Sequence, residues 1–197
     1  MFAAMFRDIL LLSMAAAALA CSKPQSDRAA PASSAPAATA ASATAPRELL
    51  AVGAPAPDLK VVAHNGTPVK ISDFRGKPVV VYFYPKDDTP GCTIEAQEIR
   101  DLWKDLGEAG AVILGVSTQD NESHRAFASK YGLPFLLLPD TDHSIARAFG
   151  VPVNERGFAK RVTFVIDRAG KIAKVYPEVD PGGHAAELLR DVRQIGT

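Results

Sequence analysis

The chain has 197 residues, and its 22 Lys and Arg side chains balance its 22 Asp and Glu side chains, which gives a formal net charge of zero. Because no basic run or stripe interrupts this balance, nucleic acid is not an expected partner. The part of the chain from residue 47 onward has about 150 residues, the usual size of one domain with one hydrophobic core. We therefore expect a single folded domain over residues 47–197.

Residues 1–20 have the pattern of a signal peptide. Ile9 to Ala20 is an apolar run of twelve residues, too short to span a bilayer and sized like the core of such a signal. The run ends in ALAC at residues 18–21, which resembles a bacterial lipobox, whose cysteine is lipidated and becomes the N-terminus after cleavage. An ordinary secretory signal and an uncleaved anchor are the alternatives.

The favoured prediction is an exported protein on the periplasmic side of a bacterial membrane, anchored by lipid on Cys21. Ser22 follows the cysteine, which resembles signals for the outer membrane. Residues 21–46 are expected to be a disordered tether: between Pro24 and Pro46, 20 of 23 residues are Ala, Pro, Ser or Thr, and none is a large hydrophobe. Such a segment cannot offset the entropy lost on ordering.

Strand and helix patterns alternate through the rest of the chain. Asn65-Gly66 is a strong hairpin signal, and a second hairpin turns at 168–170. Strands that alternate with helices, followed by a terminal hairpin and helix, predict a mixed sheet covered on both faces. The expected elements in order are a hairpin over 58–71, a strand at 79–84, a helix from 92 to 110, a strand at 111–116, a helix at 121–131, a strand at 135–138, a short helix at 144–149, a hairpin over 162–176 and a helix at 185–192.

The central feature is a cysteine at the junction of a strand and a helix. The run VVVYFY at 79–84 is typical of a strand buried on both faces. Pro90-Gly91 ends the loop that follows, so Cys92 falls in the first turn of the next helix. Unpaired N–H groups and the helix dipole stabilise a thiolate there. Glu95 and Glu98 oppose this effect if they point at the sulfur, and a buried, inert cysteine is the alternative interpretation.

The pattern P-x-x-x-T-P-G-C-T at 85–93 resembles the peroxidatic-cysteine motif of peroxiredoxins. The longer string YPKDDTPGCT at 84–93 is similar to the bacterioferritin-comigratory-protein, or peroxiredoxin Q, branch. The resemblance extends over roughly residues 50 to 195, in the segments GVS at 115–117, LPD at 138–140, AFGV at 148–151 and RVTFVID at 161–167. It implies an α/β thioredoxin-like fold, with a central mixed sheet flanked by helices and an N-terminal β-hairpin extension.

The resemblance also implies a thiol-dependent peroxidase that reduces hydrogen peroxide and organic hydroperoxides in antioxidant defence of the cell envelope. Cys92 would be the peroxidatic nucleophile, which becomes a sulfenic acid. Thr89 would supply a hydroxyl to the peroxide, although a threonine there also suits a helix cap. Arg161 would hydrogen-bond the thiolate and the peroxide, with a fork of donors that keeps its charge. Pro85 would shield the thiolate from water, or simply end the strand.

Many members of this branch carry a resolving cysteine five residues after the peroxidatic one, where this chain has Gln97. Because Cys21 is the only other cysteine and is expected to be lipidated, the sulfenic acid would be reduced by an external thiol or a thioredoxin-like reductant. A free Cys21 that reaches Cys92 is the alternative. We expect a monomer that meets the membrane only through its lipid, and no cofactor.

No histidine pair has metal-ligand spacing, so no metal site is expected and the histidines are interpreted as surface or turn residues, namely His64, His124, His143 and His184. Asp87 and Asp88 are interpreted as a solvated loop pair.

Three other functions are alternatives. A thiol–disulfide oxidoreductase would need C-x-x-C, and a metal-handling module would need a second cysteine near Cys92. A tethered peroxide sensor would use the same Cys92 chemistry, and turnover with small thiols would distinguish it from a peroxidase.

Overall fold

The structure is a computed structural model that describes residues 48–195. The expected signal peptide, Cys21 and the tether lie outside these residues, so their predictions are untested. The elements are β1 (Lys60–Val62), β2 (Pro68–Lys70), the 3₁₀ helix η1 (Ile71–Phe74), β3 (Val79–Phe83), α1 (Pro90–Asp101), α2 (Trp103–Glu108), β4 (Val112–Ser117), α3 (Asn121–Tyr131), β5 (Leu136–Pro139), α4 (Ser144–Phe149), β6 (Val162–Ile166), β7 (Ile172–Tyr176) and α5 (His184–Ile195). Within the described part of the chain, no helix is long and apolar enough to cross a membrane.

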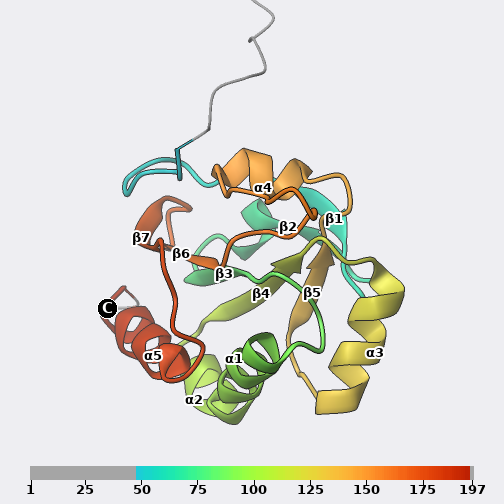
Figure 1. Cartoon of the computed structure of the whole chain (residues 1–197). Coiled ribbons are helices and arrows are strands. Elements are labelled where there is room, and N and C mark those ends of the chain that lie inside the picture. Colours follow the sequence, from blue (N-terminus) through green and yellow to red (C-terminus); the bar gives the residue numbers. More distant parts are fainter. Residues whose placement is uncertain (1–47, 196–197) are drawn as a thin grey trace, which may run out of the picture. The chain divides into compact units, whose positions relative to one another are not determined.

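A five-stranded sheet in the order β5-β4-β3-β6-β7 forms the centre of the domain (Figure 1). Strands β3, β4 and β5 run parallel, whereas β6 pairs antiparallel with both β3 and β7. Strands β1 and β2 form a separate antiparallel hairpin with Val61 opposite Val69. This arrangement confirms the predicted α/β thioredoxin-like fold, with its mixed central sheet and N-terminal β-hairpin.

Strand β3 divides the core into two halves because successive side chains of a strand point to opposite faces. Val79, Val81 and Phe83 pack with residues of α4 and the β1–β2 hairpin. Val80 and Tyr82, with Tyr84 just beyond the strand, pack with residues of α1, α2, α3 and α5. Both faces of the sheet are therefore covered, as Figure 1 shows, and the continuous apolar run at 79–84 reflects burial on both sides.

The helix expected over 92–110 differs from the prediction in two ways. It begins at Pro90, because proline suits the first helical position, where its missing N–H costs nothing. It is also divided into α1 and α2 at Leu102, whose φ of −95° and ψ of 11° leave the helical region. The apolar spacing continues through this break, which is why the sequence pattern did not indicate it.

The core is closely packed around Gly115 in β4, on the face of the sheet that α3 covers. An added Cβ there would lie 2.7 Å from Leu137 Cδ2 and 2.7 Å from Tyr82 Oη. Side chains buried on this face leave no room to absorb the extra atom. Glycine at this position leaves the space that the Tyr82 ring and the Leu137 side chain occupy.

Replacing Gly115 by Ala is expected to destabilise the domain by about 1–3 kcal/mol, the usual cost of overfilling a core. The matched change Gly107→Ala in α2 meets nothing within 4 Å and should be neutral or slightly stabilising, because alanine favours helices. Chemical denaturation followed by the fluorescence of Trp103 measures both free energies of unfolding. If Gly115→Ala is as stable as Gly107→Ala, this close packing is wrong.

Candidate active site

Cys92 lies in the first turn of α1, at the carboxyl end of β3, and is 2% exposed. The helix begins after Thr89, whose backbone is extended with φ −93° and ψ 151°. Helix geometry leaves the N–H groups of Gly91 and Cys92 without intrahelical acceptors, since the first regular bond runs from Thr93 N to Thr89 O at 2.9 Å. The sulfur therefore sits where backbone donors and the positive end of the helix dipole converge.

Arg161 is brought to this sulfur by sheet register. Val162, the first residue of β6, lies opposite Phe83, the last residue of β3. The start of β6 thus meets the end of β3, and Arg161 Nη2 donates to Cys92 Sγ at 3.2 Å. A Cβ on Gly91 would lie 3.4 Å from the same Nη2, an ordinary van der Waals distance, so the guanidinium packs directly against the first turn of α1.

Glu95 is the third member of the centre. Its carboxyl group is 1% exposed, and Oε2 accepts a short hydrogen bond from Arg161 Nη1. Its other oxygen, Oε1, has no hydrogen-bond partner among residues 48–195. Burial raises the pKa of Glu95 to about 7 against the opposing charge of Arg161. Burial lowers the pKa of Arg161, but the charges of Glu95 and Cys92 outweigh this and raise it overall.

The sequence left open whether Glu95 and Glu98 point at the sulfur. Glu95 points at Arg161 and shares the guanidinium with Cys92. Glu98 turns to the segment before α5, where its Oε2 accepts from Gly183 N at 2.7 Å. The charge nearest the sulfur on the described residues is therefore the guanidinium.

Thr89 occupies the helix-cap position without capping through its side chain. Its hydroxyl donates instead to the carbonyl of Lys86 at 3.0 Å, across the loop that precedes α1. Because the hydroxyl proton is committed to that carbonyl, the lone pairs of Thr89 Oγ1 can accept a hydrogen bond. Pro85 lies half-buried directly after Tyr84, and its shielding role remains a prediction.

Two interpretations from the sequence are corrected. Asp87 is 6% exposed rather than solvated, and its carboxylate binds three side chains of the protein. His124 is 0% exposed and His184 is also buried, so neither is a surface residue. Phe127 and Ala128 share the buried face of α3 with His124 at the i+3 and i+4 positions, a spacing that signals burial of the histidine.

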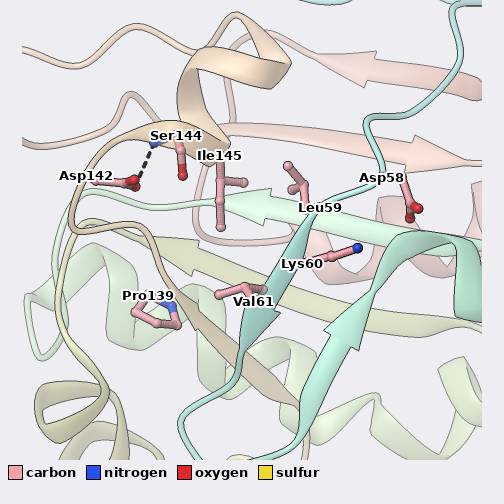
Figure 2. A pocket seen from close by; sticks show the side chains of 8 residues that line it. All are labelled: Asp58, Leu59, Lys60, Val61, Pro139, Asp142, Ser144 and Ile145. Carbon is pink, nitrogen blue, oxygen red and sulfur yellow. Dashed lines mark hydrogen bonds between the residues drawn. The ribbon is translucent and has the colours of Figure 1, made fainter. Parts of the chain in front are cut away.

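A hollow of about 520 Å³ lies elsewhere, between β1 and the start of α4 (Figure 2). Leu59, Val61 and Ile145 line its floor, and Asp142 Oδ1 accepts from Ser144 N at 3.0 Å at its rim. None of the predicted site residues lines it. Among residues 48–195, no group of three or more His, Cys, Asp or Glu side chains is placed to hold a metal ion.

Comparison with known proteins places this geometry in a family. The model of the AhpC/TSA family matches residues 52–175. Peroxiredoxin Bcp of Bacillus subtilis (strain 168) is 43% identical over 150 residues, which cover 73% of this chain and 96% of that protein. The chloroplastic peroxiredoxin Q of Sedum lineare is 43% identical over 140 residues, which cover 70% of this chain and 75% of that protein.

Solved structures agree with this likeness. Peroxiredoxin Q of Xanthomonas campestris superposes with a TM-score of 0.69 at 31% identity, over 74% of this chain and 99% of that chain. Peroxidoxin BcpB from Mycobacterium tuberculosis superposes with a TM-score of 0.68 at 36% identity, over 73% of this chain and 97% of that chain.

The raised pKa of Glu95 predicts a pH-dependent stability. A carboxyl group with a higher pKa in the folded chain stabilises the fold fully below its unfolded pKa, near 4.5, and loses that contribution as the pH rises through about 7. The stability of the wild type relative to Glu95→Gln should therefore fall between pH 4.5 and 8, by on the order of a few kcal/mol.

Free energies of unfolding of the two proteins at several pH values measure this difference. Glu98→Gln, the same change at a half-buried position of α1, controls for loss of a carboxylate from that helix. A difference between wild type and Glu95→Gln that stays constant over this pH window would show that burial does not raise the pKa.

Proposed function

This chain belongs to the AhpC/TSA family, in its Bcp/peroxiredoxin Q branch, and is a thiol-dependent peroxidase; on that premise we propose that Cys92 reacts with the peroxide and that an external thiol restores it. The observation that carries this proposal is the 3.2 Å contact of Arg161 Nη2 with Cys92 Sγ, in the first turn of α1. A buried thiol that served packing alone would not need a guanidinium, which is costly to hold inside the protein.

Five groups take part in the proposed reaction. The Cys92 thiolate attacks one peroxide oxygen, the O–O bond breaks, and the sulfur becomes a sulfenic acid while the other oxygen leaves and takes a proton to form water or an alcohol. Arg161 donates toward the sulfur and the attacked oxygen. The backbone N–H groups of the first helical turn stabilise the growing negative charge, and Thr89 Oγ1 accepts the O–H of the peroxide. Pro85, at the start of the loop, would limit the access of water.

The proposed reductant is an external thiol because residues 48–195 contain no cysteine besides Cys92, and Gln97 stands five residues after it. Two thiols reduce the sulfenic acid: the first releases water and forms a mixed disulfide with Cys92, and the second displaces Cys92 as a thiol. A small thiol or a thioredoxin-like protein can supply both. No cofactor enters this cycle.

We also propose that the domain acts outside the cytoplasm as a tethered monomer. The support is the sequence alone, namely the signal-like run at 9–20, the lipobox-like Cys21 and the Ala/Pro/Ser/Thr-rich segment that follows. In this arrangement residues 1–20 are removed, lipid on Cys21 holds the chain at the periplasmic side of the outer membrane, and residues 47–197 defend the envelope against peroxides.

Exchange of Arg161 for Lys tests whether the contact of Arg161 with Cys92 contributes to the reaction. Lys keeps the charge but loses the fork that binds Cys92 and Glu95 together, so the rate constant for reaction with hydrogen peroxide should fall about 100-fold. Sulfenic acid trapped with dimedone and counted by intact mass measures the rate. Lys160→Gln, at the neighbouring exposed position, should leave it unchanged, and Cys92→Ser should give no adduct. An Arg161→Lys protein with the wild-type rate would remove Arg161 from the reaction.

Exchange of Cys21 for Ser in the full chain tests the tether and the one-cysteine cycle together. The variant should lose the lipid mass from its mature N-terminus and leave the membrane fraction, yet turn over peroxide with dithiothreitol at the wild-type rate. A disulfide between Cys21 and Cys92 in the wild type, detected by intact mass after one equivalent of hydrogen peroxide without added thiol, would identify Cys21 as a resolving cysteine. Absence of turnover in both proteins, with Cys92 still forming sulfenic acid, would favour the peroxide sensor.

A further inference from the structure

The loop that precedes Cys92 is fixed to α3 by a buried polar cluster. Asp87 Oδ1 accepts from the hydroxyl of Tyr84 at 2.7 Å, and Asp87 Oδ2 accepts from the hydroxyl of Ser123 at 2.6 Å. His124 Nδ1 lies 2.9 Å from Oδ2 and 3.2 Å from Oδ1 of the same carboxylate. Both Ser123 and His124 belong to α3, so one aspartate joins the loop to that helix and to the end of β3.

Both ring nitrogens of His124 face hydrogen-bond acceptors. Its other nitrogen, Nε2, faces the carbonyl oxygen of Leu138 at 3.3 Å, which can only accept. Nδ1 faces the Asp87 carboxylate, so each ring nitrogen of His124 has an acceptor within hydrogen-bond distance. The two contacts fix the plane of the imidazole ring between Asp87 and the backbone of β5. Burial raises the pKa of Asp87, but the hydrogen bond and charge of His124 outweigh it and hold the pKa below its usual value.

Asp87 is the neighbour in sequence of Lys86, whose carbonyl group orients the Thr89 hydroxyl. Lys86 precedes Asp87, and the carbonyl of Lys86 accepts the hydroxyl proton of Thr89. Asp88 follows, with a left-handed backbone at φ 57°, and its carboxylate accepts from Lys130 Nζ at 2.7 Å. A displacement of Asp87 would therefore move the Lys86 carbonyl and, through it, the orientation of the Thr89 hydroxyl.

We propose that Asp87 and His124 are a positioning pair for the peroxidase reaction, which holds the loop on α3 so that Thr89 presents its oxygen beside Cys92. This inference rests on the proposed function of Cys92 and Thr89. A buried hydrogen-bonded pair of this kind adds little to stability compared with apolar side chains of the same volume. Its geometry is nevertheless specific, because each hydrogen bond fixes a direction as well as a distance.

The test compares two reactions of Cys92 in Asp87→Asn, His124→Gln and the double variant. Reaction with hydrogen peroxide needs the positioned groups, whereas alkylation by iodoacetamide needs only an available thiolate. The ratio of the two rate constants, measured far below the unfolding temperature, therefore isolates positioning from both stability and thiolate formation. Asp105→Asn is the matched control: Asp105 is a half-buried aspartate of α2, and its Oδ1 lies 3.8 Å from Arg193 Nη2.

Each single variant should lower the ratio of peroxide to iodoacetamide reactivity by about tenfold or more, since small displacements of positioned groups are costly to rate. The double variant should fall no further than the slower single variant, because both changes break the same pair. Asp105→Asn should match the wild type. If Asp87→Asn does not fold, Ser123→Ala removes one hydroxyl from the same carboxylate and should lower the ratio roughly fivefold.

Three results would overturn the inference: ratios equal to that of the wild type, a parallel fall of both reactions, or losses that multiply in the double variant. An unchanged ratio in Ser123→Ala would do the same if it is the variant that has to be used. The wild-type protein distinguishes failure of this inference from failure of the proposed function. Wild-type Cys92 that alkylates but does not react with peroxide would refute the function itself, whereas a reactive wild type with unaffected variants refutes the pair alone.

Discussion

The active centre depends on one guanidinium placed between a buried thiol and a buried carboxyl group. Arg161 contacts Cys92 and Glu95 with separate nitrogens, so the three groups share a single positive charge. Burial raises the pKa of Glu95 to about 7, so this carboxyl group is partly neutral near neutral pH even though Arg161 binds it. The three residues act as a unit, and removal of any one leaves the others imperfectly paired.

The register of the central sheet fixes the position of Arg161 relative to Cys92. Register between β3 and β6 places Val162 opposite Phe83, which puts Arg161 at the same sheet edge as the start of α1. Tyr84 extends this support beyond β3, because its ring is buried in the core while its hydroxyl reaches Asp87. The loop between strand and helix is thus held at its beginning by the core, at its middle by α3 and at its end by the first turn of α1.

Sequence patterns predicted the local part of this site, and the family resemblance proposed Arg161 as a partner of Cys92, but neither indicated the partners of Glu95 and Asp87. The apolar run at 79–84 and the Pro-Gly before Cys92 signal a strand and a helix start close together; the structure has the strand at Val79–Phe83 and starts the helix at Pro90, two residues earlier than expected. The pairing of Arg161 with Glu95 joins positions 66 residues apart, and that of His124 with Asp87 joins positions 37 apart. No local pattern encodes such contacts, so an aspartate in a polar loop was interpreted as solvated. The predictions for residues 1–47 rest on sequence alone.

A firmly held loop is consistent with a cycle that uses no second cysteine of the domain. Formation of a disulfide requires the two Cα atoms to approach within about 4.4–6.8 Å. A resolving cysteine at position 97 of α1 would lie about 8–9 Å from Cys92 on a regular helix, so α1 would have to unwind around Cys92 in every cycle. A loop fixed at Asp87 by four side-chain contacts would oppose that movement. When the reductant is an external thiol, it approaches Cys92 itself, and the loop does not have to move. The same contacts that orient Thr89 for the peroxide then act throughout the cycle without limiting its second half.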